Sequence, residues 1–378
     1  MKIYILKDNL KKALNVVEKV VSKSLTLPIL NNVLLSTEKH CLKLSVTDLE
    51  IGINYWTLAK IEKQGSTAIP VKFLTNFINS IPDSKISLEV KDTILYIEGK
   101  NYKTKIKTFN PEEFPIIPKI KEEHIIELDN LIFSQGLSQV VENASISHIR
   151  PEISGIYISF QKDVITMAAT DSFRLAEKKI FSKQIFKSEN KKEYSIIIPQ
   201  KTVRELINIL PNQKGKIKIY FSSNQVMFEC LSEGSGNPEF QIISRLIEGK
   251  YPDYQDIIPK KHKTQLILSR QEFINQIKTA SLFSGRVNKI KFKIFPEQGK
   301  IELLAQDSEI GESSSFFKGK IKGEEIEVFF NWRFLLDGLL GIESEEVIFE
   351  LNKKQEPAIL KPVGNNTFLY VVMPVSSE

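Results

Sequence analysis

Three aspartates, Asp48, Asp171 and Asp307, are the residues whose type and recurrence could support catalysis. Each follows a short apolar run that is typical of a strand, and they lie 123 and 136 residues apart. Carboxylates of this kind hold the metal pair of many nucleases, which requires two ions about 4 Å apart. Equivalent positions of a repeated segment should instead be held far apart. A turn-capping role, in which each carboxylate accepts the next backbone amides, explains all three.

No other set of residues predicts catalysis. The four histidines are scattered, and the two cysteines, Cys41 and Cys230, are 189 residues apart, so neither set has metal-site or triad spacing. Gly234-Ser235-Gly236 precedes Asn237-Pro238, which indicates a turn and not a phosphate-binding loop. We therefore expect no catalytic residue, no metal site and no cofactor. The histidines are His40, His124, His148 and His262.

Composition narrows the class of protein. The chain has 378 residues, 42% of them hydrophobic and 26% charged, which is typical of a globular protein with two or three domains. We find no apolar run of about 20 residues and no signal-peptide pattern at the N-terminus, which argues against a membrane protein. Two unpaired cysteines favour a reduced, cytoplasmic protein. A net charge of +6 permits a polyanionic partner without requiring one.

A threefold repeat organises the chain. Besides the strand-Asp element, a short strand that turns into an amphipathic helix recurs at Pro70, Pro199 and Asn331, which are 129 and 132 residues apart. Proline suits the first turn of a helix and asparagine suits an N-cap. Helical periodicity opens each copy, within residues 8–22, 129–144 and 270–283, with apolar positions that include Leu131 and Leu282.

The repeat predicts three equivalent α+β domains, each with two helices and many short strands. Pro-rich stretches near residues 114–118 and 251–254 suggest the boundaries. We predict domains at residues 1–120, 121–248 and 249–378. A period of about 126 residues is much longer than a solenoid unit, so each copy should have its own core.

The polar faces of the predicted helices are mostly basic or neutral. Repetition of such faces suits diffuse contact with nucleic-acid phosphates, although solvated helix surface is an equally good interpretation. The stripes comprise Lys12, Lys19 and Lys23; Lys72, Asn76 and Asn79; Gln135, Ser138 and Gln139; Lys201, Arg204 and Asn208; and Gln271, Asn275 and Lys278.

Five segments in order along the chain resemble the bacterial DNA polymerase III beta subunit family, the sliding clamps. They are Thr26-Leu27-Pro28-Ile29-Leu30-Asn31-Asn32, Thr47-Asp48-Leu49-Glu50, Ala169-Thr170-Asp171-Ser172-Phe173-Arg174-Leu175-Ala176, Gly249-Lys250-Tyr251-Pro252-Asp253-Tyr254 and Tyr370-Val371-Val372-Met373-Pro374. The resemblance implies three tandem clamp domains. They would close as a head-to-tail dimer into a six-domain ring, with helices inside and sheets outside.

The function that this resemblance implies is a non-catalytic one. The ring would encircle double-stranded DNA without sequence preference and confer processivity on the replicative polymerase. Its implied partners are the DNA polymerase III alpha subunit, the clamp-loader delta subunit and other proteins with a clamp-binding motif, including repair proteins. No membrane partner is implied.

The resemblance also implies a hydrophobic cleft that takes short linear peptides. Here Ser172-Phe173 stands where the family usually has Gly-His. Carried over by position, the cleft comprises Ile153, Thr170, Ser172, Phe173, Arg174, Leu175, Pro252, Ile257, Asn331, Phe334, Pro357, Val371, Val372, Met373, Pro374 and Val375.

Two further surfaces are predicted. The DNA-facing residues are expected to be Lys12, Lys19, Lys23, Lys72, Arg150, Lys201, Arg204 and Lys278. At the dimer contact, alternating lysines of one strand should meet acidic residues of the third domain, with one apolar residue from each side. These residues are Lys103, Lys105, Ile106 and Lys107 on one side and Leu282, Glu302, Glu309 and Glu312 on the other.

Two alternatives remain open at this stage. A metal-dependent nucleic-acid enzyme would use the aspartate set and would lose Mg²⁺-dependent turnover in Asp171→Asn. A repeat-domain interaction protein that never closes would be a monomer whose DNA binding is independent of DNA topology.

Overall fold

The structure, a computed structural model, describes residues 1–21, 27–118, 120, 124–147, 149–182, 193–213, 215–231, 238–353 and 355–376. Lys23, His148 and the Gly234-Ser235-Gly236 segment lie outside these residues. Contacts within the chain group it into two compact units. The first is built mainly from Met1–Phe133 and Glu205–Leu246, and the second mainly from Ser134–Ile185, Lys191–Arg204 and Ile247–Glu378.

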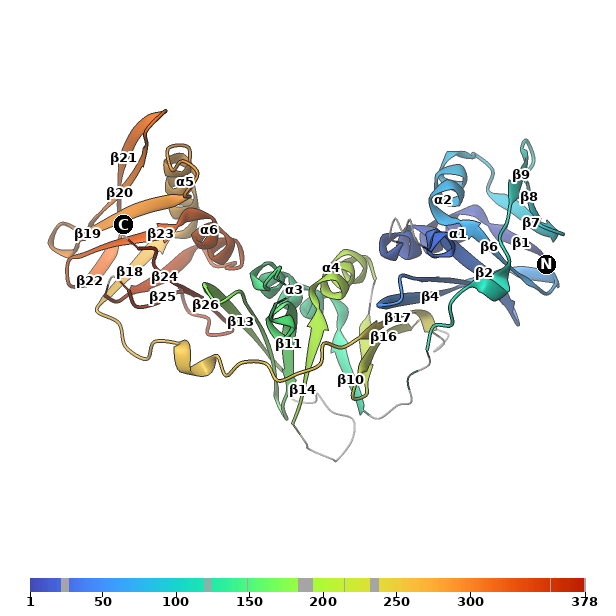
Figure 1. The fold of residues 1–378 in the computed structure, drawn as a ribbon, viewed down its shortest axis with the longest axis horizontal. Helices are drawn as coiled ribbons and strands as arrows, with labels where there is room; N and C mark the ends of the chain where they lie inside the picture. Colours follow the sequence, from blue (N-terminus) through green and yellow to red (C-terminus); the bar gives the residue numbers. More distant parts are fainter. Residues whose placement is uncertain are drawn as a thin grey trace. The chain divides into compact units, whose positions relative to one another are not determined.

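Within the described residues, each of the three repeats contains two α-helices, as predicted (Figure 1). The first helix of a copy follows one strand directly, and the second lies between two strands. Short 3₁₀ turns prolong the first helix in two copies, at Glu18–Val20 and Val141–Asn143. The α-helices are α1 (Lys7–Val17), α2 (Val71–Ser80), α3 (Asn130–Val140), α4 (Gln200–Ile209), α5 (Arg270–Ser281) and α6 (Trp332–Leu340).

Most of the predicted apolar helix positions are buried, but Val21 is only partly buried, and Leu131 and Leu282 are exposed. Leu131 is 51% exposed, because it lies six positions before the buried Leu137 and therefore off the face that Phe133 and Leu137 share. Leu282 is 69% exposed, because α5 ends at Ser281 and Leu282 follows its last turn. Leu131 therefore does not share the apolar face of its helix, whereas Leu282, which was also predicted for the dimer contact, is accessible at the end of α5.

The starts of the second helices only partly follow the prediction. Asn331 caps α6, with its side chain accepting a hydrogen bond from the Arg333 amide at 3.0 Å. Pro70 and Pro199 are instead the last residues of their strands, immediately before α2 and α4. Their fixed φ therefore serves the strand-to-helix junction and not the first helical turn.

The first unit contains two antiparallel sheets. One has the strand order β5-β1-β7-β8-β9 and the other β10-β15-β16-β17-β4-β3-β2-β6. The bounds in the first sheet are β1 (Lys2–Leu6), β5 (Lys60–Lys63), β7 (Lys85–Lys91), β8 (Ile94–Glu98) and β9 (Lys103–Lys107). Those in the second are β2 (Asn32–Glu38), β3 (Cys41–Thr47), β4 (Ile51–Leu58), β6 (Ser66–Pro70), β10 (His124–Asp129), β15 (Lys216–Phe221), β16 (Gln225–Leu231) and β17 (Pro238–Arg245).

The second unit also contains two antiparallel sheets. Their strand orders are β14-β11-β12-β13-β26-β25-β24-β18-β22 and β21-β20-β19-β23. The bounds in the larger sheet are β11 (Gly155–Phe160), β12 (Val164–Thr170), β13 (Arg174–Phe181), β14 (Tyr194–Pro199), β18 (Thr264–Ser269), β22 (Lys320–Gly323), β24 (Glu346–Leu351), β25 (Ala358–Pro362) and β26 (Phe368–Val372). Those in the smaller sheet are β19 (Lys289–Phe295), β20 (Lys300–Asp307), β21 (Gly311–Lys318) and β23 (Ile326–Asn331).

Strand pairing joins the sequence repeats to one another within each unit. In the first unit β17 pairs with β4, with Phe240 opposite Tyr55. In the second unit β13 pairs with β26, with Leu175 opposite Val371. The two compact units therefore each combine strands from more than one repeat.

The helices cover the sheets through buried apolar faces. In the first unit α1 packs against α2, and in the second α5 packs against α6 (Figure 1). Phe273 of α5 contacts an aromatic cluster with Phe292, Phe330 and Phe349 at ring-centroid distances near 6 Å. In the part of the chain described by the structure, no helix has both the length and the apolar character needed to cross a membrane.

Candidate functional site

The three aspartates cap turns, as the sequence predicted. In each case Oδ1 accepts hydrogen bonds from the backbone amides two and three residues later. The distances are 3.0 and 2.8 Å at Asp48, 3.0 and 3.0 Å at Asp171, and 2.9 and 3.0 Å at Asp307. Within the described residues, no group of three or more His, Cys, Asp or Glu side chains is arranged to hold a metal ion. The aspartates therefore have a structural role.

A network of polar contacts in the second unit is centred on Arg174, at the start of β13. Its Nε donates to Asp171 at 2.9 Å, one terminal nitrogen contacts Asp337, and the other donates to the Glu142 carbonyl oxygen at 2.8 Å. The guanidinium carbon lies 4.6 Å from the centre of the Phe334 ring. The side chain is only 12% exposed, and this geometry exploits both the fork and the flat face of the guanidinium.

The pairing of β13 with β26 explains why residues almost 200 positions apart form one site. Arg174 lies opposite Val372, and Leu175 lies opposite Val371. Beyond β26 the chain continues along this site, since the Met373 amide donates to the Phe173 carbonyl at 2.9 Å. The Val375 amide then donates to the Phe329 carbonyl at 2.8 Å, which ties the tail to β23.

All sixteen residues predicted for the peptide cleft lie in the second unit. They differ in solvent accessibility, so they cannot all contact a bound peptide. The buried members are Ile153, Thr170, Leu175, Val371 and Val372. The partly buried members are Arg174, Pro252, Asn331, Phe334, Pro357, Met373, Pro374 and Val375, and the exposed members are Ser172, Phe173 and Ile257.

The turn that carries Phe173 is braced by hydrogen bonds around a left-handed residue. Ser172 has φ of +77°, a left-handed value that favours glycine. The Ser172 amide donates to the Thr170 hydroxyl at 3.1 Å, and the Thr170 hydroxyl donates to the Arg174 carbonyl at 2.6 Å. This turn leaves Phe173 62% exposed beside Met373. The departure from Gly-His thus adds backbone strain and an accessible apolar ring.

A buried aromatic cluster supports the site from below. Tyr157 stacks on Tyr251 at 5.0 Å between ring centres, and Tyr254 meets both rings edge-on. Ile153, Leu175 and Val371 pack in the same cluster. These three buried members of the predicted cleft therefore form part of its supporting layer.

The connector that follows Tyr251 is anchored by a carboxylate. Glu177 is buried, and it accepts hydrogen bonds from the Tyr254 hydroxyl and from Gln255 Nε2, both at 2.7 Å. Burial and the neighbouring Glu177 charge raise the pKa of Tyr254 well above its ordinary value, so the phenol stays protonated and donates. Ile257, two residues after Gln255, lines a depression of ≈ 430 Å³ together with Pro357.

Sequence reasoning missed Asp337, Glu142 and Glu177. Asp337 and Glu177 lie within patterns that were interpreted only as helix and strand, and Glu142 acts through its backbone carbonyl, which any residue type could supply. Asp337 lies in the interior of α6, six residues after the helix cap Asn331, and nothing in its local sequence indicates that it meets Arg174.

The residues predicted to face DNA are exposed wherever they are described, but several are already paired. Lys12 contacts Glu239, Arg150 contacts Glu152 at 3.1 Å, and Arg204 contacts Glu142 at 2.8 Å. Lys19 donates to the Asn208 carbonyl at 2.5 Å. Lys72, Lys201 and Lys278 are exposed, and Lys23 lies outside the described residues.

The residues predicted for a dimer contact lie on two edge strands or beside them. β9 forms one edge of its sheet, with Lys103, Lys105 and Lys107 exposed on one face as the alternation predicted. Ile106, the apolar candidate on β9, is only 7% exposed, because it faces the core of its own sheet.

The acidic partners of this contact lie in the smaller sheet of the second unit. There β21 forms an edge and contains Glu312, while Glu309 precedes it in an exposed turn. Glu302 lies on the neighbouring β20, largely buried and 3.8 Å from Lys293. The third repeat therefore offers an acidic edge, although Glu302 is less accessible than predicted.

Comparison with known proteins gives the same result along the whole chain. Models of the N-terminal, central and C-terminal domains of the DNA polymerase III beta subunit match residues 1–118, 127–253 and 255–376. The chain is 28% identical over 385 residues to the beta sliding clamp of Staphylococcus aureus, covering 99% of both chains.

Solved structures agree with these sequence matches. The DNA polymerase sliding clamp of Bacillus subtilis is 26% identical and has a TM-score of 0.92 over 100% of both chains. The sliding clamp of Bartonella birtlesii bound to griselimycin is 27% identical, with a TM-score of 0.91 over 100% of this chain and 99% of that one. The chain therefore belongs to the DNA polymerase III beta subunit family, the bacterial sliding clamps, and it functions as a DNA sliding clamp and not as an enzyme.

Proposed function

We propose that two copies of this chain close head to tail into a ring around double-stranded DNA. The ring tethers the DNA polymerase III alpha subunit to its template and serves as a docking hub for the clamp-loader delta subunit and other proteins with a clamp-binding motif. The observation that carries the proposal is the end-to-end match to complete sliding clamps, at TM-scores of 0.91–0.92. A ring of this kind acts by topology, so it needs no catalytic group.

Charge and strand geometry support the head-to-tail contact. β9 and β21 are edge strands of sheets in different units, and an unpaired edge is a ready template for another strand. The lysines of β9 and the acidic residues Glu309 and Glu312 at β21 carry opposite charge, which favours unlike edges over like ones. Leu282, exposed at the end of α5, supplies apolar surface to this contact. The dimer interface thus comprises Lys103, Lys105 and Lys107 with Leu282, Glu309 and Glu312, and Ile106 and Glu302 support it from beneath.

The contact with DNA is weak and diffuse. Lys72 and Lys278 present exposed cations on α2 and α5, alongside neutral Asn76 and Asn275. Lys12, Arg150 and Arg204 already have carboxylate partners, which reduces the attraction they offer to phosphates. Because few cations are left to pair with phosphates, the salt-dependent affinity of the ring for DNA is low. A low affinity lets the ring slide along the duplex.

The partner site is the surface around Arg174, Phe173 and Met373. Exposed Phe173 and Ile257, with partly buried Phe334 and Met373, provide an apolar surface of the kind that short linear peptides occupy. Met373 is flexible enough to adapt to different side chains. Because the Bartonella relative was solved with griselimycin, we expect that compound to bind this chain at the same residues. The two free cysteines, Cys41 and Cys230, support a reducing cytoplasmic location.

Light scattering behind size exclusion tests the proposal, at micromolar protein concentration. A closed dimer has a mass of about 86 kDa, twice the 43.2 kDa of the chain. The dimer is then loaded onto closed circular DNA and the DNA is linearised. Release on linearisation is the expected result, because only the topology of the DNA has changed. A monomer that binds circular and linear DNA equally would instead support a non-closing interaction protein.

A further inference from the structure

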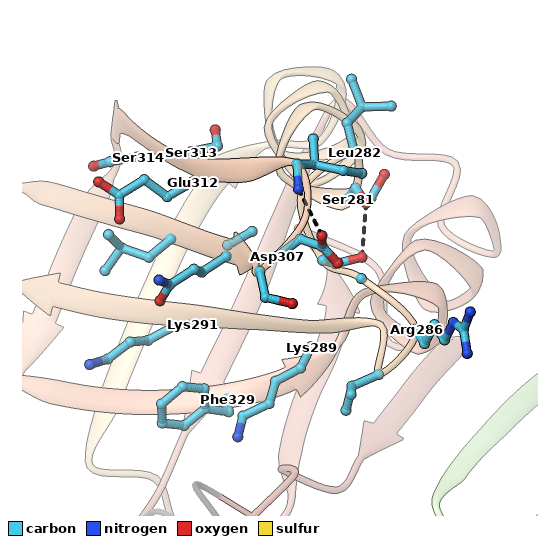
Figure 2. A pocket seen from close by; sticks show the side chains of 18 of the residues that line it. Ser281, Leu282, Arg286, Lys289, Lys291, Asp307, Glu312, Ser313, Ser314 and Phe329 are labelled. Carbon is cyan, nitrogen blue, oxygen red and sulfur yellow. Dashed lines mark hydrogen bonds between the residues drawn. The ribbon is translucent and has the colours of Figure 1, made fainter.

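A second and larger hollow lies over one face of the smaller sheet in the second unit. Its volume is ≈ 1250 Å³, and it is lined by side chains from β19, β20, β21 and β23 and from the loop at residues 282–288 (Figure 2). Leu282, Glu309 and Glu312 of the proposed dimer contact line one part of it, but no surface proposed above includes Arg286, Lys289 or Phe329. The charge of its lining residues differs between its two ends.

The two ends of this hollow carry opposite charge. Figure 2 shows Lys289, Lys291 and Phe329 together on one side, with Arg286 projecting from the adjacent loop, and Glu312 with Ser313 and Ser314 on the other side. Cross-strand pairing explains the cationic side, because Lys291 lies opposite Phe329 and Lys289 lies opposite Asn331. We refer to Arg286, Val287, Lys289 and Phe329 as the Lys289 end.

The cations differ in how far they are already neutralised. Lys291 is paired with Glu327 at 2.9 Å and Lys293 with Glu302 at 3.8 Å. Among the described residues, no carboxylate lies within 4 Å of Lys289 Nζ, which instead lies 4.5 Å from the centre of the Phe329 ring. Arg286 is exposed on its loop. The Lys289 end therefore retains positive charge beside an aromatic face.

The loop that carries Arg286 and Val287 is fitted closely to the sheet. Gly285 has φ of +58°, and a Cβ at this position would lie 2.4 Å from Asp307 Oδ2. Asp307 is fixed in turn by the Glu309 and Ile310 amides, and the Ser284 hydroxyl donates to the Ser281 carbonyl at 2.8 Å. The backbone that carries Arg286 and Val287 is thus fixed against the sheet, while both side chains stay exposed.

The Lys289 end is continuous with the proposed partner cleft. Asn331, a cleft residue, lies directly across from Lys289, and the Trp332 amide donates to the Asn288 carbonyl at 2.9 Å. The Val375 amide donates to the carbonyl of Phe329, whose ring lines the hollow. A peptide that leaves the cleft along the chain tail would therefore arrive at Lys289.

We propose that the Lys289 end receives an acidic residue that flanks the partner's clamp-binding segment. Lys289 and Arg286 pair with its carboxylate, while Phe329 and Val287 contact its aliphatic stem. The proposal rests on the function proposed above, because it requires a peptide in the cleft. It extends the recognised ligand from an apolar segment to an apolar segment with an acidic flank.

Calorimetry with two matched peptides tests the proposal. Each contains the clamp-binding segment of the alpha subunit from the same source, extended at one end with Glu-Glu or with Gln-Gln, and both ends are tried. At low salt the Glu-Glu peptide should bind about two- to fivefold more tightly at one of the two ends, as expected for partly exposed ion pairs. That gain should disappear in Lys289→Gln, shrink in Arg286→Gln and weaken at high salt.

Lys293→Gln is the matched control, since Lys293 lies on the same strand and face but is paired with Glu302. It should leave the gain intact. Equal affinity for the two peptides at both ends, or a gain that survives Lys289→Gln, would overturn the inference while leaving the cleft in place. Failure of the Gln-Gln peptides to bind the wild-type protein would reject the cleft itself, and the inference with it.

Discussion

Arg174 on β13 and Asp337 on α6 form an ion pair that joins the second repeat to the third within one compact unit. The residues are 163 positions apart, and only the pairing of β13 with β26 brings them together. The same guanidinium holds Asp171 and the Glu142 carbonyl, so one side chain fixes a turn, a 3₁₀ segment and a helix. Arg174 therefore has a structural role in addition to the ligand contact that we propose for it.

Replacing Asp337 with Asn should destabilise the protein by about 1–3 kcal/mol, because a largely buried cation loses one of its two carboxylates. Binding of the alpha-subunit segment should weaken as well. Without the Asp337 carboxylate, the Arg174 guanidinium is no longer fixed over the Phe334 ring. Urea unfolding and calorimetry measure the two effects. Glu345→Gln is the control, as Glu345 is exposed on the loop that follows α6. Equal stability of the two variants would contradict the structural role of the pair.

The left-handed turn at Ser172 predicts a stabilising substitution. Ser172→Gly should raise the melting temperature, since relief of a φ of +77° outweighs the greater entropy of glycine in the unfolded chain, with a net gain of about 0.5–1 kcal/mol. Leu49, at φ of +79° in the equivalent turn of the first repeat, should respond in the same direction. Scanning calorimetry checks both. A lower melting temperature for both glycine variants would show that the turns are not strained.

The hydrogen bond from Tyr254 to Glu177 should stabilise the connector locally. Tyr254→Phe leaves one lone pair of a buried carboxylate unsatisfied, which should cost about 1–3 kcal/mol. Hydrogen exchange should speed up at residues 251–258 more than elsewhere. Tyr4→Phe, at an exposed tyrosine, serves as the control. Uniform acceleration across the unit would mean that the bond stabilises the fold as a whole and not the connector.

The two cysteines should differ in reactivity. Burial, with the nearby Glu239 charge, raises the pKa of Cys230 to about 12, so its thiol stays protonated at pH 8. Cys41 is only partly buried, and burial raises its pKa less. A thiol reagent at pH 8 should therefore modify Cys41 first in the native protein, and Cys230 only after unfolding.

The raised pKa of Cys230 also has a consequence for stability. Between the ordinary thiol pKa near 9 and about 12, the unfolded chain loses this proton while the folded chain keeps it. The contribution of Cys230 to stability therefore falls as pH rises through that window. Cys230→Ser, whose hydroxyl does not ionise there, should flatten this part of the pH–stability curve. Equal slopes for the two proteins would argue against the shift.

Charge reversal on β9 should weaken the proposed dimer. Lys103→Glu, Lys105→Glu and Lys107→Glu together place like charges at the contact with Glu309 and Glu312, so the mass at low concentration should fall toward 43.2 kDa. Lys60→Glu with Lys63→Glu on β5, the opposite edge of the same sheet, is the matched control and should not change the mass. An unchanged dimer in the β9 variant would place the contact elsewhere.

The sequence predicted what depends on local order. The repeated strand-helix-strand elements, the two helices of each copy and the three turn-capping aspartates were all confirmed, because apolar periodicity and turn chemistry act over a few residues. The same reasoning was wrong for Leu131. Its side chain is apolar, but its spacing from Phe133 and Leu137 places it off the buried face of the helix.

The pairings that make the site could not be predicted from periodicity. Nothing in β13 or β26 alone specifies that Arg174 lies opposite Val372, because the register of distant strands depends on the packing of both. Asp337 and Glu177 were missed for the same reason, since a charged residue on a helix or strand looks solvent-facing until its distant partner is known. Resemblance to the family predicted the cleft residues but gave no account of what supports them.

The pairing of β13 with β26 also has a mechanical meaning. Its paired residues run from Arg174 opposite Val372 to Lys178 opposite Phe368. If a partner bound at Phe173 and Met373 pulls parallel to these strands, the force acts in shear. It then loads all the hydrogen bonds between β13 and β26 at once. A pull across the strands would open them one by one from the Arg174 end. The site should therefore resist force from a bound partner more strongly along the strands than across them.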